Sequence, residues 1–390
     1  MLQPLPSAGK EQTVIVGMSG GVDSAVAALL LRDAGYAVQG LFMSNWEDDD
    51  GYCTTAEDFQ DARRVSDILG IALHRVSFAG EYRERVFKHF LSEYAAGRTP
   101  NPDVLCNREI KFGICLEYMQ RLGASWIATG HYAKISRAGA GVQLLKAADS
   151  SKDQSYFLHS VAAAALAKTL FPLGELHKAE VRRIAHAAGL PVFDKADSTG
   201  ICFIGERPFQ EFLSSHLRTE PGPIETADGK IVGEHGGLAL YTLGQRSGLK
   251  VGGRAGAAAA PWYVADKDIE RNALLVVQDQ NHPLLLSDAF SVEQMHWINP
   301  QDTPPAALEC AVKTRYRQSD LSCSLQLGDA GNWRVELDRP ARAVTPGQYA
   351  VFYAGDRCLG GGIIAQRFNS ARAPAARAIA YNSLFSVEGS

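Results

Sequence analysis

The stretch from residue 13 to residue 31 constrains the fold most, because an apolar run leads into a glycine turn and then an Ala/Leu-rich segment. Residues 14–16 predict a buried strand, and the Ala/Leu-rich segment predicts a helix. Between them lies GMSGGVDS, residues 17–24. Glycines let the backbone approach a ligand closely, and the free N–H groups of a first helical turn bind anions. We therefore expect a phosphate site here, with two hydroxyl groups and a carboxylate able to hold a phosphate-bridging Mg²⁺, supplied by Ser19, Ser24 and Asp23.

Two common phosphate-binding loops do not fit these residues. The Walker pattern requires a lysine, which is missing, and Gly17, Gly20 and Gly21 have the wrong spacing for the dinucleotide pattern GxGxxG. SGGVDS instead resembles the PP-loop of the N-type ATP pyrophosphatases, which cleave ATP between the α and β phosphates and adenylate an oxygen. The alternative is an ordinary strand–turn–helix with a glycine turn, which does not require this combination of residues.

The composition bounds the class of protein. A chain of 390 residues, 46% hydrophobic and 21% charged, predicts an ordinary globular protein with two or three domains. We expect it to be cytoplasmic, because it has no membrane-length apolar run and its first residues lack the apolar core of a signal peptide. Seven cysteines, an odd number, argue against a secreted disulfide framework, so any disulfide is expected to be transient and catalytic. The net charge of −4 counts mildly against a nucleic-acid partner but allows a local basic face.

Strand-like and helix-like segments then alternate along the first third of the chain. Residues 37–43 and 72–77 have strand patterns, whereas residues 55–69 and 81–96 have helical spacing. This alternation predicts an α/β fold with a doubly wound parallel sheet, in which ligands bind at the carboxyl ends of the strands. The acidic segment 45–53 lacks the ligand alternation of an EF-hand, which favours a solvated surface loop over a calcium site.

Residues 97–112, GRTPNPDVLCNREIKF, carry the first candidate cysteine. Two prolines keep the segment before Asp103 extended, and Asp103 is expected to cap a helix that has Cys106 in its first turn. That position lowers a thiol pKa, and two nearby cations act in the same direction. A carboxylate three residues away opposes this effect unless it serves as a proton acceptor. The alternative is a capped helix with a buried, inert cysteine.

Two later segments contribute further candidates. Residues 125–129 predict a strand that ends at Gly130, where a nucleotide can approach closely, and His131 is expected to be a structural hydrogen-bonding residue. Residues 197–205 form a glycine-flanked apolar segment with Cys202 in the middle, for which a buried core cysteine is the alternative.

The second half of the chain has a different character. Glycine and short strands dominate residues 215–265, and Asp228-Gly229 predicts a hairpin. Short alternating strands recur from residue 289 to residue 368, which predicts a small β-barrel or sandwich. The last residues, with ARAPAARAIA, predict weak structure.

Taken together, seven motifs in this order resemble one family, the tRNA-specific 2-thiouridylases (MnmA/TrmU). They run from residue 17 to about residue 318, and GGIIAQ extends the match, whereas the tail beyond 368 has no counterpart. The resemblance implies a PP-loop catalytic domain (1–212), a small central β-rich domain (213–283), a C-terminal β-barrel that contacts tRNA (284–368) and a weakly structured tail (369–390). The motifs are GMSGGVDS, NPDVLCNREIKF, ATGHYA, KDQSYFL, STGICFIG, YTLGQRSGL and KTRYRQ.

The resemblance also implies a chemistry and its residues. ATP would adenylate O2 of the wobble uracil, and sulfur from a persulfide-carrying donor protein would arrive on Cys202. Cys106 would act as the nucleophile and close a transient disulfide with Cys202, and Asp103 would be the acid/base residue. ATP contacts are implied for Gly17, Met18, Ser19, Gly20, Gly21, Val22, Asp23, Ser24, Met43 and Gly130, with Mg²⁺ held at Asp23 through ATP. Contacts with the target base are implied for Asn101, Pro102 and Asp103, and tRNA contacts for Lys152, Asp153, Gln154, Arg315 and Tyr316.

Three alternatives come from other classes. A PP-loop ligase that adenylates a small molecule shares the loop but has no use for the two cysteines. A non-catalytic tRNA-binding protein is contradicted by the intact SGGVDS. An iron–sulfur cluster held by Cys106, Cys202 and Asp103 would have one open site, and the spacing does not decide against it.

Overall fold

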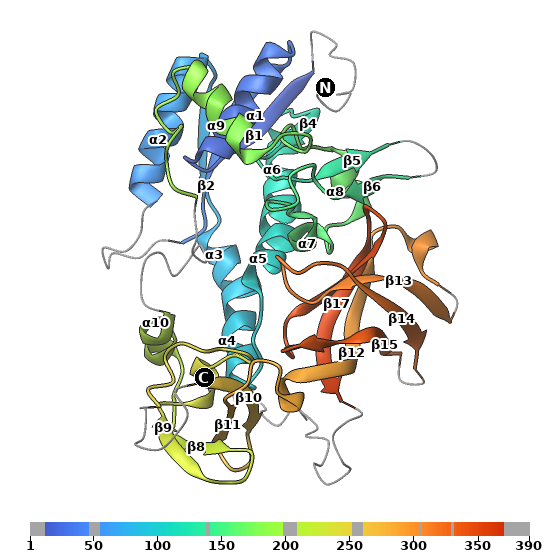
Figure 1. The fold of residues 1–390 in the computed structure, drawn as a ribbon. Coiled ribbons are helices and arrows are strands. Elements are labelled where there is room, and N and C mark those ends of the chain that lie inside the picture. Colours follow the sequence, from blue (N-terminus) through green and yellow to red (C-terminus); the bar gives the residue numbers. More distant parts are fainter. Residues whose placement is uncertain are drawn as a thin grey trace.

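The structure is a computed structural model, and it describes residues 12–46, 55–137, 141–197, 209–251, 260–304, 306–328 and 331–369. These residues form three sheets. Figure 1 shows the first sheet and its helices at the top, the second sheet at the bottom and the third at the right. In the described part of the chain, no helix has the length and apolar character that crossing a membrane requires.

The first sheet has five parallel strands in the order β3-β2-β1-β4-β7. The chain passes outward from β1 to β2 and β3 and then returns to the other side of β1. Such a reversal leaves a ligand crevice at the carboxyl ends of the central strands. The predicted doubly wound sheet is therefore confirmed. Its strands are β1 (Thr13–Met18), β2 (Ala37–Ser44), β3 (Leu73–Ser77), β4 (Trp126–Ala128) and β7 (Thr169–Leu170).

Both faces of this sheet are covered. Val14 and Val16 of β1 pack into a core with helices α1, α2 and α9, whereas Ile15 packs into a second core on the opposite face. Burial on both faces explains why β1 is a continuous apolar run rather than an alternating one. The helices of the first face are α1 (Val22–Asp33), α2 (Thr55–Leu69) and α9 (Lys178–Ala187).

The second face carries a helical path that leads toward Cys106. The helix expected over residues 81–96 is divided into α3 (Ala79–Tyr82), a π-helical turn η1 (Arg83–Phe87) and α4 (Lys88–Ala95). π-Helical turns are rare and are frequent at functional sites. After an extended segment the path continues as α5 (Pro102–Leu105), π-helical η2 (Cys106–Ile114) and α6 (Cys115–Arg121).

The second sheet has four strands in the order β10-β11-β8-β9. The hairpin predicted at Asp228-Gly229 is present, because β8 and β9 pair antiparallel and Gly229 adopts a φ of 81°. Helix α10 (Phe209–His216) places Phe212 6.0 Å from Phe87, between ring centroids, which fixes this domain to the helical path. The strands are β8 (Gly222–Thr226), β9 (Ile231–His235), β10 (Tyr263–Asp268) and β11 (Ala273–Val277).

The third sheet closes on itself, since β12 pairs with both β15 and β17. It is therefore a six-stranded barrel, and of the two predicted architectures the sandwich is wrong. A hairpin of the first domain, β5 (Lys134–Ser136) and β6 (Gln143–Leu145), extends the sheet by pairing with β17. The barrel strands are β12 (Leu286–Trp297), β13 (Ala307–Lys313), β14 (Leu321–Leu327), β15 (Trp333–Arg342), β16 (Tyr349–Ala354) and β17 (Arg357–Phe368). The remaining short helices are α7 (Ser155–Leu158), α8 (Ala163–Ala167), η3 (Leu238–Leu240), η4 (Pro283–Leu285) and η5 (Pro300–Asp302).

Candidate active site and RNA-facing cleft

The glycine loop between β1 and α1 is braced from within by its two serines. The Ser19 N–H donates to Ser24 Oγ at 3.1 Å, and Ser24 Oγ donates to the Gly21 carbonyl at 3.1 Å. Gly20 has a φ of +76°, and a Cβ there would lie 2.3 Å from the Asp58 carbonyl oxygen. The loop thus opens onto the N-terminus of a twelve-residue helix, where backbone N–H groups and the helix dipole favour an anion.

The Asp23 carboxylate lies at the centre of an ion-pair network beside this loop. Lys178 Nζ donates to both of its oxygens at 2.8 Å, and the Tyr132 hydroxyl donates at 2.7 Å. Lys178 Nζ also lies 2.7 Å from Asp197, which accepts from Lys152 Nζ at 2.7 Å. Burial raises the pKa of Asp197, but the hydrogen bonds from Lys152 and Lys178 outweigh it and hold that pKa at about 2. Lys152 and Lys178 are therefore held beside the glycine loop by the carboxylates of Asp23 and Asp197.

Asp23 could supply only part of the ligand set that Mg²⁺ requires. Mg²⁺ usually takes one or two carboxylates together with substrate phosphates, and Asp23 supplies one. The described residues contain no group of three or more His, Cys, Asp or Glu side chains that could hold a metal by themselves. The phosphates of ATP would have to complete the coordination, and Lys178 would have to release the carboxylate.

Lys195 ties the glycine loop to helix α2. Its ammonium donates to the Gly20 carbonyl at 3.1 Å, to Asp58 at 2.8 Å and to Asp61 at 2.5 Å. Residue 195 lies far from the loop in the sequence, and nothing in its local pattern indicated this role.

The segment that carries Cys106 is held in place from two other domains. Residues 97–101, here called the strap, begin at a turn, and Lys267 of β10 donates to the Gly97 carbonyl at 3.0 Å. The Thr99 N–H donates to the Pro346 carbonyl at 3.0 Å, and the Gln348 amide donates to the Thr99 carbonyl at 2.8 Å. The central sheet and the barrel therefore both position the helix that follows the strap.

Two expectations for that helix are wrong. Asn101, not Asp103, is the N-cap, and its side chain accepts from the Asp103 N–H at 3.2 Å. Pro102 occupies the first helical position, so Cys106 falls in the second turn rather than the first. Burial raises the pKa of Asp103, with Lys111 opposing it. Asp103 is thus suited to hold a proton and to donate it.

The Cys106 side chain is only 1% exposed. Its Sγ lies 4.0 Å from Asn45 Nδ2. Cys202 lies outside the described residues, so its distance from Cys106 stays a prediction. Asn107, the next residue, donates to the Phe157 carbonyl at 3.1 Å and links the segment to α7.

Two ATP candidates outside the loop lie at the same sheet edge. A Cβ at Gly130 would lie 2.7 Å from the backbone nitrogen of Ser24, so only glycine fits there. Met43 is near the carboxyl end of β2. His131 beside Gly130 is buried, accepts or donates a 2.7 Å hydrogen bond at Thr129, and has its pKa lowered by burial. These are the surroundings of a structural histidine.

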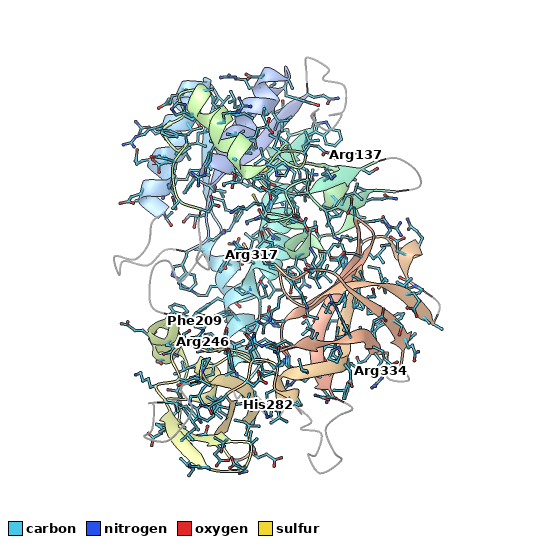
Figure 2. All side chains as sticks on the ribbon, viewed as in Figure 1. Arg137, Phe209, Arg246, His282, Arg317 and Arg334 are labelled. Carbon is cyan, nitrogen blue, oxygen red and sulfur yellow. The ribbon has the colours of Figure 1, made fainter. Side chains whose placement is uncertain are left out.

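A basic cleft of about 470 Å³ opens between the first domain and the barrel. Tyr316 forms one wall: its ring lies 4.4 Å from Phe157, and its hydroxyl donates to the Lys152 carbonyl at 3.2 Å. Arg317, near the centre of Figure 2, is exposed on the same cleft. The lining residues are Ser150, Ser151, Lys152, Lys313, Tyr316, Arg317 and Gln318.

Comparison with known proteins decides the family. Three family models match in chain order: a tRNA methyl transferase HUP domain over residues 12–206, a tRNA methyl transferase PRC-barrel domain over 210–278 and an aminomethyltransferase β-barrel domain over 287–364. The chain is 56% identical to the tRNA-specific 2-thiouridylase MnmA of Chromohalobacter salexigens, over 91% of this chain and 93% of that protein. It is 54% identical to the MnmA of Marinobacter nauticus, over 95% and 96%.

The chain belongs to the tRNA-specific 2-thiouridylase family. This confirms the resemblance expected from the motifs. Among solved structures, the U34-tRNA thiolase NcsA of Methanococcus maripaludis matches 53% of this chain and 64% of its own, with a TM-score of 0.34 and 19% identity. That likeness is too distant to carry an argument.

Not all tRNA-contact candidates of this family member reach the cleft. Lys152 and Tyr316 line it. Asp153 is buried and accepts from the Ala147 N–H at 3.1 Å, and Gln154 accepts from the Tyr132 N–H at 2.9 Å. The Arg315 guanidinium donates to the carbonyls of Leu243 at 3.0 Å and Ala343 at 2.9 Å, so it joins the central domain to the barrel.

The sequence argument missed four functional candidates. Lys178 lies in a segment that none of the quoted motifs covers, and Tyr132 was visible only as part of the motif ATGHYA. Lys313 and Arg317 lie within the motif KTRYRQ, as Arg315 and Tyr316 do, but strand alternation did not reveal which cations face the cleft.

Proposed function

We propose that this protein replaces O2 of the wobble uridine of tRNA with sulfur, using ATP. The observation that carries the proposal is the adjacency of three features. Lys152 connects the anion site at residues 17–24 to the basic cleft, because it pairs with Asp197 and lines the cleft. The Cys106 segment reaches the same cleft through the hydrogen bond from Asn107 to Phe157, whose ring packs on Tyr316. Family membership supports the same function.

The first step is adenylation of the base. The uracil O2 attacks the α-phosphate, the new O–P bond forms as the bond to diphosphate breaks, and the N-terminus of α1 with Lys178 stabilises the negative charge. Bound Mg²⁺ would supply further charge neutralisation at Asp23. The target base must leave its stack to reach the site, and an anticodon loop makes this inexpensive because its bases are already unpaired.

The second step transfers sulfur. A donor protein leaves a persulfide on Cys202, and the Cys106 thiolate attacks Cys202 Sγ, which breaks the bond between Sγ and the outer sulfur. A Cys106–Cys202 disulfide forms, hydrosulfide leaves and adds to C2, and AMP departs with the former O2. Asp103 exchanges a proton with the base during this addition and elimination. An external thiol must then reduce the disulfide before the next turnover.

The decisive experiment is mass spectrometry of tRNA nucleosides after incubation with ATP, Mg²⁺ and a persulfide source. The expected product is uridine carrying sulfur in place of oxygen, together with AMP. Gain of a methyl group instead would favour the chemistry named in the family-model descriptions. AMP formation with unmodified tRNA would favour the small-molecule ligase, and an iron assay on anaerobically purified protein tests the cluster alternative.

A further inference from the structure

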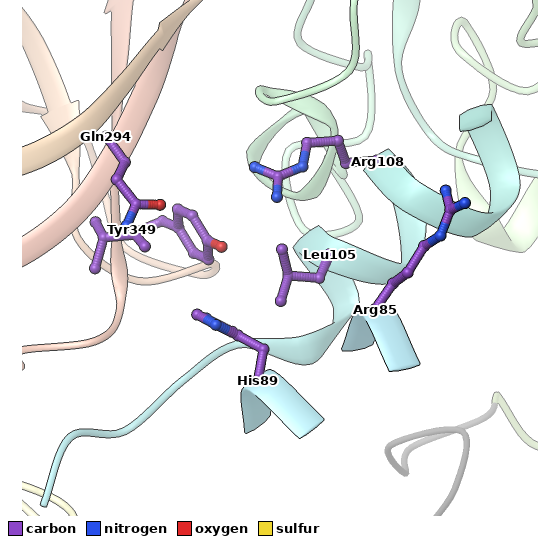
Figure 3. Close-up of a pocket in the computed structure, with 7 residues that line it drawn as sticks. Arg85, His89, Leu105, Arg108, Gln294 and Tyr349 are labelled. Atoms are coloured by element: carbon purple, nitrogen blue, oxygen red, sulfur yellow. The ribbon is translucent and has the colours of Figure 1, made fainter. Parts of the chain in front are cut away.

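A second, smaller pocket lies on the other side of the Cys106 segment. Its volume is about 170 Å³, and it opens where the helical path meets the barrel. Figure 3 shows His89, Leu105 and Arg108 on one side facing Gln294 and Tyr349 on the other. Arg85, His89, Leu105 and Arg108 come from the helices, and Gln294 and Tyr349 come from the barrel.

The lining of this pocket is rich in hydrogen-bond donors. One carboxylate, Glu109, lies between the two guanidiniums, 2.8 Å from Arg108 Nε and 3.8 Å from Arg85. Positive charge is therefore in excess. Burial raises the pKa of Tyr349 to about 12, so its hydroxyl stays protonated. An occupant must accept hydrogen bonds and carry negative charge.

Gln294 gives an independent sign that the pocket is built for a ligand. It has a φ of +51°, which is uncommon for a residue other than glycine, and it lies in a register shift between Glu293 and His296 of β12. β-Bulges re-aim side chains and recur next to functional sites, where strained backbone also gathers. Figure 3 shows the Gln294 amide pointing toward Tyr349 and Arg108.

The pocket and the basic cleft lie on either side of Cys106. Leu105 precedes the cysteine and lines the pocket. Asn107 follows it and bonds to Phe157, whose ring packs on Tyr316 in the wall of the cleft. An RNA strand that presents one base to Cys106 while its backbone follows the cleft would bring a neighbouring nucleotide to the pocket.

We propose that this pocket is an RNA subsite, in which Arg85, Arg108 and Gln294 hold the phosphate of a nucleotide next to the one that is thiolated. The inference rests on the proposed function. The volume of about 170 Å³ is large enough for a phosphate group, because it is several times the roughly 30 Å³ that one water molecule occupies in the liquid. Two guanidiniums suit the fork geometry of phosphate recognition.

The test compares Arg108→Gln with Arg121→Gln as a matched control. Arg121 is an exposed arginine of α6 whose nearest carboxylate, Glu117, lies 4.0 Å away. Affinity for an anticodon stem-loop is measured over a series of KCl concentrations. For Arg108→Gln we expect weaker binding and a salt slope reduced by about 0.7, the value for one contact with single-stranded RNA. Arg121→Gln should match the wild type.

Stem-loops with one neutral methylphosphonate linkage then locate the contact. A neutral linkage beside the target nucleotide should weaken RNA binding by the wild-type protein. The same linkage should not weaken RNA binding by Arg108→Gln any further. Gln294→Ala leaves both arginines and Glu109 in place, so it should weaken binding with an unchanged slope. Thermal unfolding and ATP binding at wild-type levels establish that each variant is folded.

Three results would overturn the proposal. The first is wild-type affinity in both Arg108→Gln and Gln294→Ala. The second is weaker binding of Arg108→Gln with an unchanged slope and no coupled linkage, which indicates a base contact. The third is RNA binding by the variants at wild-type affinity, together with stabilisation of the wild type, but not of the variants, against thermal unfolding by orthophosphate. That result would indicate a site for free anions. Nucleoside mass spectrometry is separate: binding without 2-thiouridine rejects the proposed function and leaves the subsite standing.

Discussion

The Asp23 carboxylate shows how little of a site a single residue contains. One ammonium and one phenol hold it, and a second carboxylate shares that ammonium. The Asp23 side chain is therefore held in one position beside the glycine loop. Its position depends on residues more than a hundred positions away in the sequence.

Asp23→Asn should reduce tRNA-dependent AMP formation by about 10²- to 10³-fold, because the amide keeps the shape but loses the charge that orients Lys178 and supports Mg²⁺. Asp33→Asn, at the exposed end of the same helix beside Arg32, is the control and should keep the wild-type rate. Measurement of AMP release from ATP tests this. An active Asp23→Asn enzyme would show that the carboxylate is structural.

Substitution of either cysteine should stop the reaction, but at a different stage. Cys202→Ser should block sulfur loading and all 2-thiouridine formation, whereas Cys106→Ser should still accept sulfur on Cys202 and stop before transfer. Without reductant, the wild-type enzyme should stall after about one turnover with the two cysteines joined. Peptide mapping after a single turnover tests this, with Cys310→Ser, a partly exposed barrel cysteine, as control. Extra sulfur resting on Cys106 would reverse the roles.

At the scale of elements, the strap depends on a buried lysine. Lys267 is buried, and burial lowers its pKa to about 7, with Asp266 opposing. Burial of this charge costs free energy. The ammonium donates a hydrogen bond to the Gly97 carbonyl, and this bond holds the segment before Asp103 in place. The central sheet thus helps to position the segment that leads to Asp103 and Cys106.

This arrangement predicts how stability changes with pH. Between about pH 7 and the ordinary lysine pKa of 10.5, the unfolded chain holds a proton on Lys267 that the folded chain has lost. The free energy of unfolding should therefore rise with pH across that window, by up to about 1.4 kcal/mol per pH unit, relative to Lys267→Met. Urea unfolding of both proteins at pH 7, 8 and 9 measures the difference. A constant difference would mean that Lys267 titrates normally.

The elements also show what the sequence could predict. Residues 14–16 and 55–69 formed the expected strand and helix, because their apolar patterns are local and regular. The prediction that Asp103 is the N-cap was wrong, although the sequence contains the pattern for the correct cap. Asparagine caps well and proline favours the first helical position, so the helix begins after Asn101. Lys178, Lys195 and the pairing of Arg315 with backbone carbonyls depend on tertiary packing, which no local pattern contains.

At the scale of the whole molecule, three domains meet around the Cys106 segment. Arg315 bonds to the central domain through Leu243, and the strap bonds to the central sheet and the barrel. Substrate binding should therefore depend on junction residues as well as on residues that touch RNA. The two kinds can be separated by their response to salt.

Arg317→Gln removes an exposed cation from the cleft and should weaken tRNA binding with a salt slope reduced by about 0.7 to 0.9. Arg315→Ala should instead lower the free energy of unfolding by about 1–3 kcal/mol, because the Leu243 and Ala343 carbonyls lose a charged donor. Its loss of tRNA affinity should leave the slope unchanged. Denaturant unfolding and binding over a salt series distinguish them, and a reduced slope for Arg315→Ala would make it a direct phosphate contact.

The pairing of β6 with β17 has a consequence for how the chain is made. Leu145 pairs with Arg357, so a ribosome releases the hairpin of β5 and β6 long before the strand that covers its edge. At about 5–20 residues per second, that edge stays unpaired on the order of ten seconds or more. Unpaired edges template association between nascent chains. Fragments that stop before β17 should therefore self-associate during translation, and the catalytic domain reaches its final form only when synthesis is nearly complete.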